Sequence, residues 1–439
     1  MGKSREQWTR RLRTLLGDTK TSGMAGNATA LYTAHVLGLI VPLLTIPYLA
    51  RVLRPSGWGL VVFAQSFGAW LALVLEYGFD LSGTRAVARV RSDPQRLPEV
   101  VAGVQGAKML MVLTAPIVVL ILYLTVPSFQ RAPAYLLWAG AFAVARALGP
   151  TWYFFGLERM KGPAMIEAGA KVLAALGVFL WVKGPEHGWR VLALQAVATS
   201  ASLAWLTIWM YREIPMHRPR LAQALQTLKE SSGVFLFRSS SGLYLQANAF
   251  VLGLLTTPQV VAFFGGAERI IRAAINLFHP LSQTLFPRMS HLMVTDADRA
   301  ERLLTMGLIG MVGLGIAMGI TAAVGAPTLV QVFLGPGYES AIPVLRVLSV
   351  LPPVIAVGTV FGIQWALPMG LERPFYLFVL CAGVINIILA VLLVPRYGAV
   401  GMAVSVMTAE ILVAGCLTAL FKRKGGRLTP IHVLRGKGV

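Results

Sequence analysis

Charged residues are scarce in this chain: Asp, Glu, Lys and Arg make up 13% of its 439 residues, about half of their share in an average soluble domain. Apolar residues make up 56%, and the mean hydropathy is +0.69. This composition excludes an ordinary soluble globular protein and predicts a polytopic membrane protein. The apolar segments are about 20 residues long, so each can cross the hydrocarbon core as a helix, whereas the strands of a membrane barrel would be half as long.

Residue types that carry catalysis or bind metals are scarce as well. The two cysteines, Cys381 and Cys416, both fall in apolar segments, so a disulfide is not expected. The six histidines are scattered, without the spacing of a metal site. The sequence contains no HExxH, paired CxxC, GxxxxGKS/T or GxSxG motif. These absences predict a protein that is not an enzyme and has no metal or other cofactor.

Acidic residues are outnumbered, 18 against 39 lysines and arginines, which gives a formal net charge of +21. Such an excess is often a sign of nucleic-acid binding. Here, however, most basic residues fall in alternate loops, on one side of the expected membrane, so the positive-inside rule predicts that both termini are cytoplasmic. The basicity therefore indicates topology and contact with membrane lipids, and no nucleic-acid partner is expected. Some basic residues lie inside apolar segments instead: Lys108, Arg146, Lys171, Arg238, Arg269, Arg272 and Arg346.

The apolar segments predict about twelve membrane-spanning helices and hence an all-α fold. Short polar turns separate them, and one longer polar stretch divides the first six from the last six. The expected spans are residues 28–50, 58–80, 100–126, 133–156, 164–182, 190–211, 233–255, 260–286, 303–334, 342–368, 374–394 and 398–421.

These spans define the expected domain organisation, with one lobe of six helices on each side of the longer polar stretch. The basic N-terminal segment is either an interfacial helix on anionic lipid, because Trp8 and Leu12 stand at helical spacing among arginines, or a plain cytoplasmic tail. The expected parts are a basic cytoplasmic segment (1–26), an N-terminal six-helix lobe (27–211), a cytoplasmic linker (212–232), a C-terminal six-helix lobe (233–421) and a basic cytoplasmic tail (422–439).

The two halves show weak internal similarity. When the sequence is shifted by 203 residues, "RPSGWGLVVFAQS" from Arg54 aligns with "TPQVVAFFGGAER" from Thr257. Because each half holds an even number of expected spans, the two copies are parallel and related by a pseudo-two-fold axis along the membrane normal. Transporters with repeats of this kind place the substrate path between the halves.

Charged residues inside the membrane require an explanation, because inserting a Lys or Arg at the bilayer centre costs a free energy of at least about 2.5–3.5 kcal/mol. A spacing of four residues predicts two ion pairs along helix faces, Glu167 with Lys171 and Glu268 with Arg272. These pairs favour a structural role for Lys171.

Arg146, Arg238 and Arg269 have no local acidic partner, so they are candidates for an anion-binding path. Guanidinium groups around a water-filled vestibule attract anions and offer bidentate contacts to phosphate. Gln246 and Asn248 follow Arg238 in a polar stretch that suits hydrogen bonds to sugars, although packing of small residues explains part of this stretch. The candidate substrate-binding residues are Arg238, Arg269, Arg146, Arg272, Asn248 and Gln246.

Acidic residues in or beside the spans have two interpretations. Glu76, Asp80 and Glu410 are candidates for coupling transport to a proton or sodium gradient, and they are equally suited to be ion-pair partners of basic residues. Three arginines near the cytoplasmic ends of spans are expected at the entrance of the path: Arg85, Arg89 and Arg288.

The stretch "IPYLARVLRPSGWGLVVFAQSFGAWLALVLEYGFDLSGTRAVAR" resembles the N-terminal signature of bacterial polysaccharide repeat-unit flippases of the Wzx type. The segments "PTWYFFGLERMKG" from Pro150 and "PRYGAVGMAVSVMTAEI" from Pro395 resemble further blocks of that family, and the similarity extends over nearly every span. Two positions depart from the family pattern: Arg54 stands where the family usually has glycine, and Asp80 stands where asparagine is common.

This resemblance implies the fold of the superfamily of multidrug, oligosaccharidyl-lipid and polysaccharide exporters, with two six-helix bundles around a central cavity, as in MATE transporters. It also implies movement of an undecaprenyl-diphosphate-linked oligosaccharide across the bacterial inner membrane by alternating access, for O-antigen, capsule or exopolysaccharide synthesis. A polysaccharide polymerase and a chain-length regulator are the protein partners that it implies.

Two other functions remain open at this stage. A multidrug or lipid exporter of the same superfamily would share the architecture but would suit a cationic substrate and an acidic cavity. An integral-membrane glycosyltransferase or polymerase is less favoured, because such enzymes need a sizeable outer loop with catalytic acids, and the expected outer loops are short.

Overall fold

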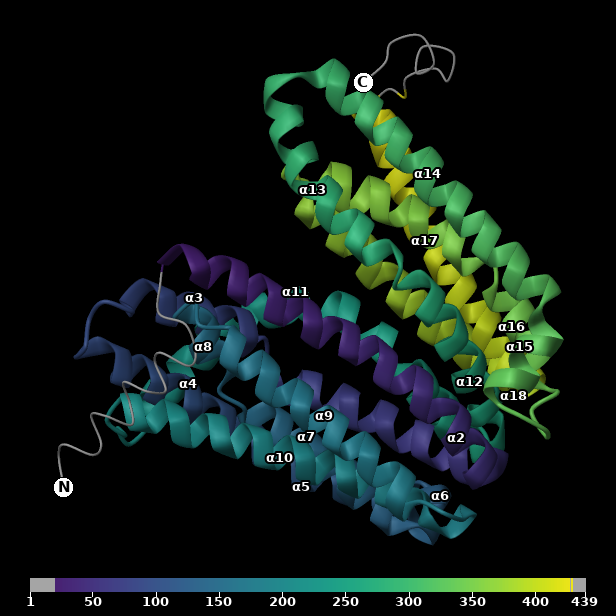
Figure 1. The fold of residues 1–439 in the computed structure, drawn as a ribbon, viewed down its shortest axis with the longest axis horizontal. Helices are drawn as coiled ribbons and strands as arrows, with labels where there is room; N and C mark the ends of the chain where they lie inside the picture. The colour runs from purple at the N-terminus through teal and green to yellow at the C-terminus, as the bar shows by residue number, and fades with distance from the viewer. Residues whose placement is uncertain (1–19, 427, 429–439) are drawn as a thin grey trace. The chain divides into compact units, whose positions relative to one another are not determined.

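The computed structural model describes residues 20–426 and residue 428, and this part of the chain contains only helices and loops (Figure 1). The prediction of an all-α fold is confirmed. The expected interfacial helix around Trp8 lies outside the described residues, as does most of the expected C-terminal tail (422–439).

The chain divides into two compact units. The first unit contains the chain up to Val52 and Phe67–Ser239, and the second contains Leu53–Ser66 and the chain from Ser240 onward. The beginning of the second expected span thus belongs to the same unit as the last five spans. The lobe boundaries expected from the sequence, at residues 211 and 233, stay a prediction.

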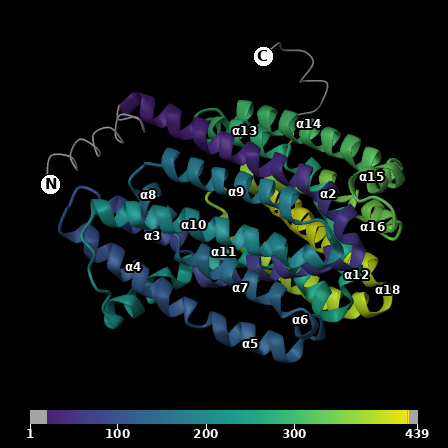
Figure 2. The same ribbon diagram turned by 60° about the horizontal axis from the view of Figure 1, so that its bottom comes forward.

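In the first unit α10 packs antiparallel to α9 and parallel to α7, and α3 packs against α8 (Figures 1 and 2). Its elements are α2 (Lys20–Glu76, without Leu53–Ser66), α3 (Phe79–Val90), α4 (Arg96–Val112), α5 (Ala115–Thr125), α6 (Pro127–Arg131), α7 (Pro133–Leu148), α8 (Thr151–Gly156), α9 (Lys161–Trp181), the short η1 (Pro185–His187), α10 (Gly188–Glu213) and the beginning of α11 (Leu221–Leu255).

The second unit is built around α14, which packs against α17, and around α12, which packs against α16 and α18. Its elements are the middle of α2, the end of α11, α12 (Pro258–Ile275), α13 (Phe278–Thr295), α14 (Ala297–Val324), α15 (Ala326–Phe333), α16 (Ala341–Leu348), α17 (Leu351–Thr359), the π-helical η2 (Val360–Ala366) and α18 (Glu372–Arg423).

Seven stretches of the described chain are long and apolar enough to cross a membrane. Two of them, Val36–Val90 and Glu372–Arg423, hold two expected spans each, because α2 kinks at Arg54 and α18 kinks at Gly398. The remaining expected spans fall on α7 with α8, on α11, and on α12 with α13. The helices therefore follow the sequence pattern, although several spans are broken in two.

Proline and glycine explain these breaks. Pro116 stands in the first turn of α5 and separates it from α4, since proline cannot donate a hydrogen bond inside a continuous helix. Gly149 and Pro150 separate α7 from α8 in the same way. Tyr77 and Gly78 have positive φ angles of 48° and 72° and end α2 before α3 begins. Each break leaves backbone groups that need other partners.

The linker expected over residues 212–232 is helical from Leu221 onward. Ala224 is 2% exposed and packs in the core of the first unit, where Leu228 adjoins it. An apolar residue every fourth position gives this polar stretch one face to bury, which is enough to extend α11 by three turns before the seventh span.

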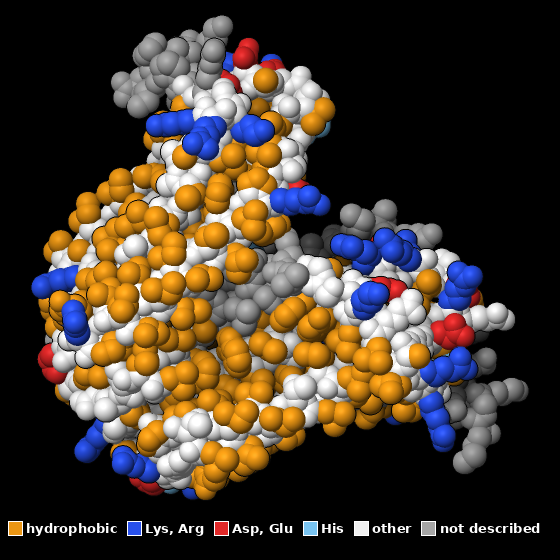
Figure 3. Space-filling model, turned by 180° about the vertical axis from the view of Figure 1, so that it is seen from behind, with side chains coloured by type: hydrophobic (Ala, Val, Ile, Leu, Met, Phe, Trp, Pro, Cys, Tyr) orange, Lys and Arg blue, Asp and Glu red, His pale blue; other side chains and the backbone are white. Residues whose placement is uncertain are grey.

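Each unit has its own apolar core, and its flanks are also apolar. The core of the first unit includes Phe79, Val104, Trp152, Phe154 and Leu206, and that of the second includes Phe278, Met289, Leu304, Phe361, Trp365 and Phe421. Leucines such as Leu113 and Leu124 are exposed by 68% and 62%. Figure 3 shows hydrophobic side chains over much of one face of the molecule, with few Lys and Arg side chains among them. This surface suits a lipid environment.

Arg54 occupies a backbone conformation that normally requires glycine, with φ 58° and ψ 172°. This region costs a residue with a Cβ about 1–3 kcal/mol. By the sequence resemblance described above, glycine is usual at this position, and the arginine that stands here adopts the turn at the expense of strain.

We expect Arg54→Gly to raise the free energy of unfolding by about 1 kcal/mol, because glycine relieves this strain while adding some entropy to the unfolded chain. Thermal unfolding of the detergent-solubilised protein would measure the change. Arg51→Gly is the matched control, since Arg51 lies within the helix and its replacement should destabilise the protein. Equal destabilisation by both substitutions would contradict the strain at Arg54.

Candidate functional site

Among the described residues of the first unit, Lys108 is the most deeply buried charged residue, with 1% exposed. Its Nζ donates a 2.7 Å hydrogen bond to the carbonyl oxygen of Gly149 and lies 5.6 Å from the ring centroid of Trp152. Nearby, Nε2 of Gln105 donates to the carbonyl oxygen of Leu148. Two side chains of α4 thus satisfy carbonyls at the end of α7, where a positive charge also favours the helix dipole.

Arg146, in the last turn of α7, pairs with Glu167 of α9 at 3.1 Å. The other carboxylate oxygen of Glu167 accepts a hydrogen bond from the hydroxyl of Thr151. The expected pair of Glu167 with Lys171 is wrong: in the described structure Glu167 points to these two partners from other helices, and Lys171 is exposed. A carboxylate in an apolar environment binds the nearest cation in space, which need not be the nearest in sequence.

Glu76 and Asp80 lie close enough to act electrostatically on both Lys108 and Arg146. Glu76 ends α2 and Asp80 lies in the first turn of α3, so the left-handed break at Tyr77 and Gly78 separates the two acids. Together with Glu167, these residues form a first-unit charge cluster: Glu76, Asp80, Lys108, Arg146 and Glu167. Three acids and two bases give it a formal charge of −1.

The sequence placed Lys108 inside a span but gave it no role. Its carbonyl partner is 41 residues away, and no spacing rule connects the two positions. The useful signal was the Gly-Pro break at residues 149–150, because a helix that ends inside an apolar span leaves carbonyls that need a donor.

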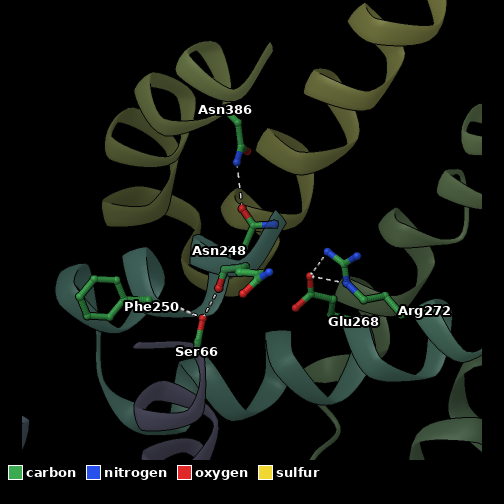
Figure 4. Close-up of polar contacts among 7 residues, drawn as sticks. Ser66, Asn248, Phe250, Glu268, Arg272 and Asn386 are labelled. Carbon is green, nitrogen blue, oxygen red and sulfur yellow. Dashed lines mark hydrogen bonds and ion pairs between the residues drawn. The ribbon is translucent and has the colours of Figure 1, made fainter. Parts of the chain in front are cut away.

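In the second unit, the predicted pair of Glu268 with Arg272 is confirmed, at 2.8 Å on α12 (Figure 4). The side chain of Glu268 is 14% exposed and that of Arg272 is 40% exposed. Both line a small cavity of about 20 Å³ together with Glu410 of α18. That volume is enough for about one water molecule. Glu410 thus belongs to a second-unit charge cluster with Glu268 and Arg272.

Arg269 lies one residue away on α12 but has different surroundings. Its guanidinium donates a 2.7 Å hydrogen bond to the side-chain oxygen of Gln65 and lies 4.5 Å from the ring centroid of Trp58. Trp58 is 1% exposed. The cation is therefore held by a neutral amide and an aromatic face, which stabilise its charge without neutralising it.

Two polar contacts join α11 to its neighbours in the second unit (Figure 4). Asn248 is 2% exposed, and its side-chain oxygen accepts a 2.9 Å hydrogen bond from Nδ2 of Asn386. The hydroxyl of Ser66 donates to the carbonyl oxygen of Gln246 and accepts from the backbone N–H of Phe250, so it bridges one turn of the helix. The side chain of Gln246 is exposed. Asn248 thus has a buried structural contact, whereas Gln246 remains accessible.

The other candidates are not brought together. Arg238 lies on α11, in the stretch 236–245 whose side chains fall outside the described part of the structure. Arg85 and Arg89 are exposed on α3, and Arg288 is exposed on α13. Within the described residues, no group of three or more His, Cys, Asp or Glu could hold a metal ion.

We expect Lys108→Met to lower the free energy of unfolding by about 1–3 kcal/mol, because the Gly149 carbonyl loses its charged donor and the acids of the first-unit charge cluster lose a counter-ion. Thermal unfolding in detergent would measure the loss. The exposed Lys171 provides the matched control, and Lys171→Met should change stability by less than about 0.5 kcal/mol. Equal stability of the Lys108→Met and wild-type proteins would show that this lysine does not support the α7 break.

Two curated proteins resemble the chain over almost its whole length. A protein of Escherichia coli K12 named as a putative O-antigen transporter is 26% identical over 407 residues, which cover 90% of this chain and 97% of that protein. A protein of Shigella dysenteriae with the same name is also 26% identical, over 89% of this chain and 98% of its own length. The expectation of a transporter rather than an enzyme agrees with both names.

Solved structures show the same fold. The lipid II flippase MurJ in an inward closed conformation has a TM-score of 0.70 and 14% identity, and the match covers 93% of this chain and 89% of that one. An inward-facing multidrug resistance transporter of the MATE family has a TM-score of 0.65 and 14% identity, over 91% and 100% of the two chains. The predicted MATE-like fold is therefore confirmed.

The family model described as polysaccharide biosynthesis protein matches residues 24–293. This region contains the first eight expected spans, the first-unit charge cluster and the α12 arginines. The resemblance found in the sequence is confirmed, and this multi-pass membrane protein belongs to the polysaccharide biosynthesis protein family.

Proposed function

We propose that this protein is a flippase that moves undecaprenyl-diphosphate-linked oligosaccharide repeat units from the cytoplasmic to the outer face of the bacterial inner membrane, for polysaccharide synthesis. The observation that carries the proposal is the match, over about nine-tenths of the chain, to two proteins named as putative O-antigen transporters. The fold shared with a lipid II flippase supports a lipid-linked cargo.

The diphosphate of such a cargo needs cations along its path. The candidate arginines differ in whether a carboxylate already pairs with their guanidinium group. Arg146 and Arg272 already pair with carboxylates, so each must exchange its acid for a phosphate. Arg269 is held by Gln65 and Trp58, which are neutral. We therefore rank Arg269 first as a phosphate ligand. Arg238 is retained as a second candidate, because both residues belong to the first two spans of the C-terminal half.

The sugars of the cargo need hydrogen-bonding groups. Gln246 remains a candidate, because its side chain is exposed on α11. Asn248 would have to leave Asn386 before it could bind a sugar, so we assign it a lower rank. The exposed Arg85, Arg89 and Arg288 fit an entrance that attracts the anionic headgroup from the cytoplasmic side.

Transport would proceed by alternating access of a cationic central cavity, with both termini in the cytoplasm. Each unit has an acid-containing cluster that could couple this exchange to a proton or sodium gradient. In the first unit the acids are Glu76 and Asp80, and in the second Glu410 shares a cavity with the Glu268–Arg272 pair. A polysaccharide polymerase and a chain-length regulator would receive the cargo at the outer face.

A multidrug or other lipid exporter is the second candidate. It is favoured by the fold shared with MATE transporters and by the net acidic character of the first-unit charge cluster, which suits a cationic substrate. The flippase is preferred because the two whole-length relatives carry the transporter name and because arginines stand inside the spans.

Reconstitution into vesicles with a lipid-linked oligosaccharide tests the proposal by scoring which sugars are protected from an external glycosidase. We expect the wild-type protein to translocate the oligosaccharide. Arg269→Ala and Arg238→Ala should each lower the rate about 10- to 100-fold, because each removes a charge-assisted contact of about 1.5–3 kcal/mol. Arg269→Lys should recover only part of the rate, since lysine cannot give a bidentate contact.

Arg346→Ala is the matched control, because Arg346 is exposed on α16 and should leave the rate unchanged. Wild-type rates in both the Arg238 and Arg269 variants would remove the cationic path. Wild-type protein that exports a cationic dye but leaves the oligosaccharide in place would favour the multidrug exporter.

A further inference from the structure

An apolar groove runs between α5 and α7 of the first unit, with a volume of about 510 Å³. Ligand sites in proteins commonly occupy about 300–1,000 Å³. No charged side chain lines this groove, and its polar side-chain atom is the hydroxyl of Tyr123. Its walls include Pro116, Val119 and Tyr123 on α5 and Leu137, Gly140 and Ala141 on α7. A groove of this kind in a membrane-spanning unit selects a hydrocarbon chain.

The sequence explains why this groove exists. Pro116 separates α5 from α4, so α5 runs beside α7 as an independent helix. The facing side of α7 includes two small residues, Gly140 and Ala141, and a Cβ added at Gly140 would come within 3.0 Å of Val119. The backbone contact is therefore tight at Gly140, while Ala141 leaves space beside it. The small side chains of Gly140 and Ala141, set among larger apolar side chains of both helices, leave a channel that a flexible chain can fill.

The length of the groove limits its occupant. Its α5 wall runs from Ala115 to Tyr123, which is about 12 Å at 1.5 Å per residue. A single leaflet is about 15 Å thick, half of the hydrocarbon core. The groove thus accommodates an acyl chain of one leaflet. A polyprenyl tail of tens of carbons would extend far beyond it, and a partner's membrane helix would need a contact across both leaflets.

A cation stands at the end of the groove that opens next to α6. Arg131 is exposed and ends α6, and Pro133 of the groove wall follows two residues later. Their Cα atoms are therefore at most about 7.6 Å apart. Arg131 takes part in none of the ion pairs of the described residues. A chain in the groove would therefore have its headgroup at the end nearest to Arg131, whose long side chain is exposed.

We propose that the α5–α7 groove is a binding site for an anionic phospholipid of the leaflet predicted to be outer, with one acyl chain in the groove and its phosphate paired with Arg131. The site is separate from the proposed transport path, because neither charge cluster contributes to its walls. The proposal of a lipid site depends on the membrane location of the first unit and does not depend on flippase activity. A bound lipid here would fill the gap between α5 and α7 and brace the α6 turn.

Native mass spectrometry of the full-length protein, purified in detergent and titrated with phosphatidylglycerol, tests this proposal. We expect one tightly bound lipid per protein. Arg131→Gln should weaken it at least fivefold, and Arg131→Lys should retain most of the binding because the charge remains. Ala141→Trp should also weaken it at least fivefold, by filling the groove from an exposed position.

Two matched controls separate the groove from the rest of the surface. Lys183→Gln removes a basic residue of the α9–η1 turn, and Val197→Trp enlarges a side chain that is 55% exposed on α10. Both should bind phosphatidylglycerol like the wild type, and all variants should elute as folded protein on size exclusion.

Unchanged lipid binding in both Arg131→Gln and Ala141→Trp, with the proteins folded, would overturn the site. Retention of undecaprenyl phosphate in preference to phosphatidylglycerol, lost in Ala141→Trp, would overturn the phospholipid as occupant and assign the groove to the prenyl tail. Oligosaccharide translocation, measured separately, is expected to persist in Arg131→Gln, so failure of this site and failure of the proposed function give different results.

Discussion

The absence of water inside a bilayer is the constraint on which this structure depends. A backbone carbonyl or a charged side chain in the hydrocarbon region must find its partner within the protein. The chain breaks several spans with proline and glycine, and each break raises this demand. At the end of α7, Lys108 and Gln105 of the neighbouring α4 supply the donors for the free carbonyls. These two polar contacts follow from the place where the span is interrupted.

The same constraint explains why intramembrane charges occur in clusters. Arg146 and Arg272 are each matched by a glutamate, so the charge of these two guanidinium groups is neutralised locally. Arg269 is the exception among the described arginines of these helices, because an aromatic ring and an amide hold it. Such a site keeps a cation available to an anionic ligand without the cost of first separating an ion pair.

Local patterns made much of the fold predictable. The length of the apolar segments predicted the spans. The four-residue spacing of Glu268 and Arg272 predicted an ion pair that the structure contains. The same spacing failed for Glu167, whose partner Arg146 is 21 residues away on another helix. Spacing reports neighbours on one helix, while packing between helices decides which cation is nearest. The role of Arg54 was hidden for a similar reason: its charge was visible in the sequence, but its positive φ was not.

The contact between Lys108 and Gly149 also has a consequence for how the protein is made. The ammonium lies in the third span, whereas its carbonyl partner follows 41 residues later, at the end of the fourth. At about 5–20 residues per second, the ribosome needs roughly 2–8 s to add that stretch. During this interval the third span carries a charge that the bilayer disfavours. We therefore expect the third and fourth spans to enter the bilayer together. This buried hydrogen bond thus influences the order of membrane insertion as well as the stability of the folded protein.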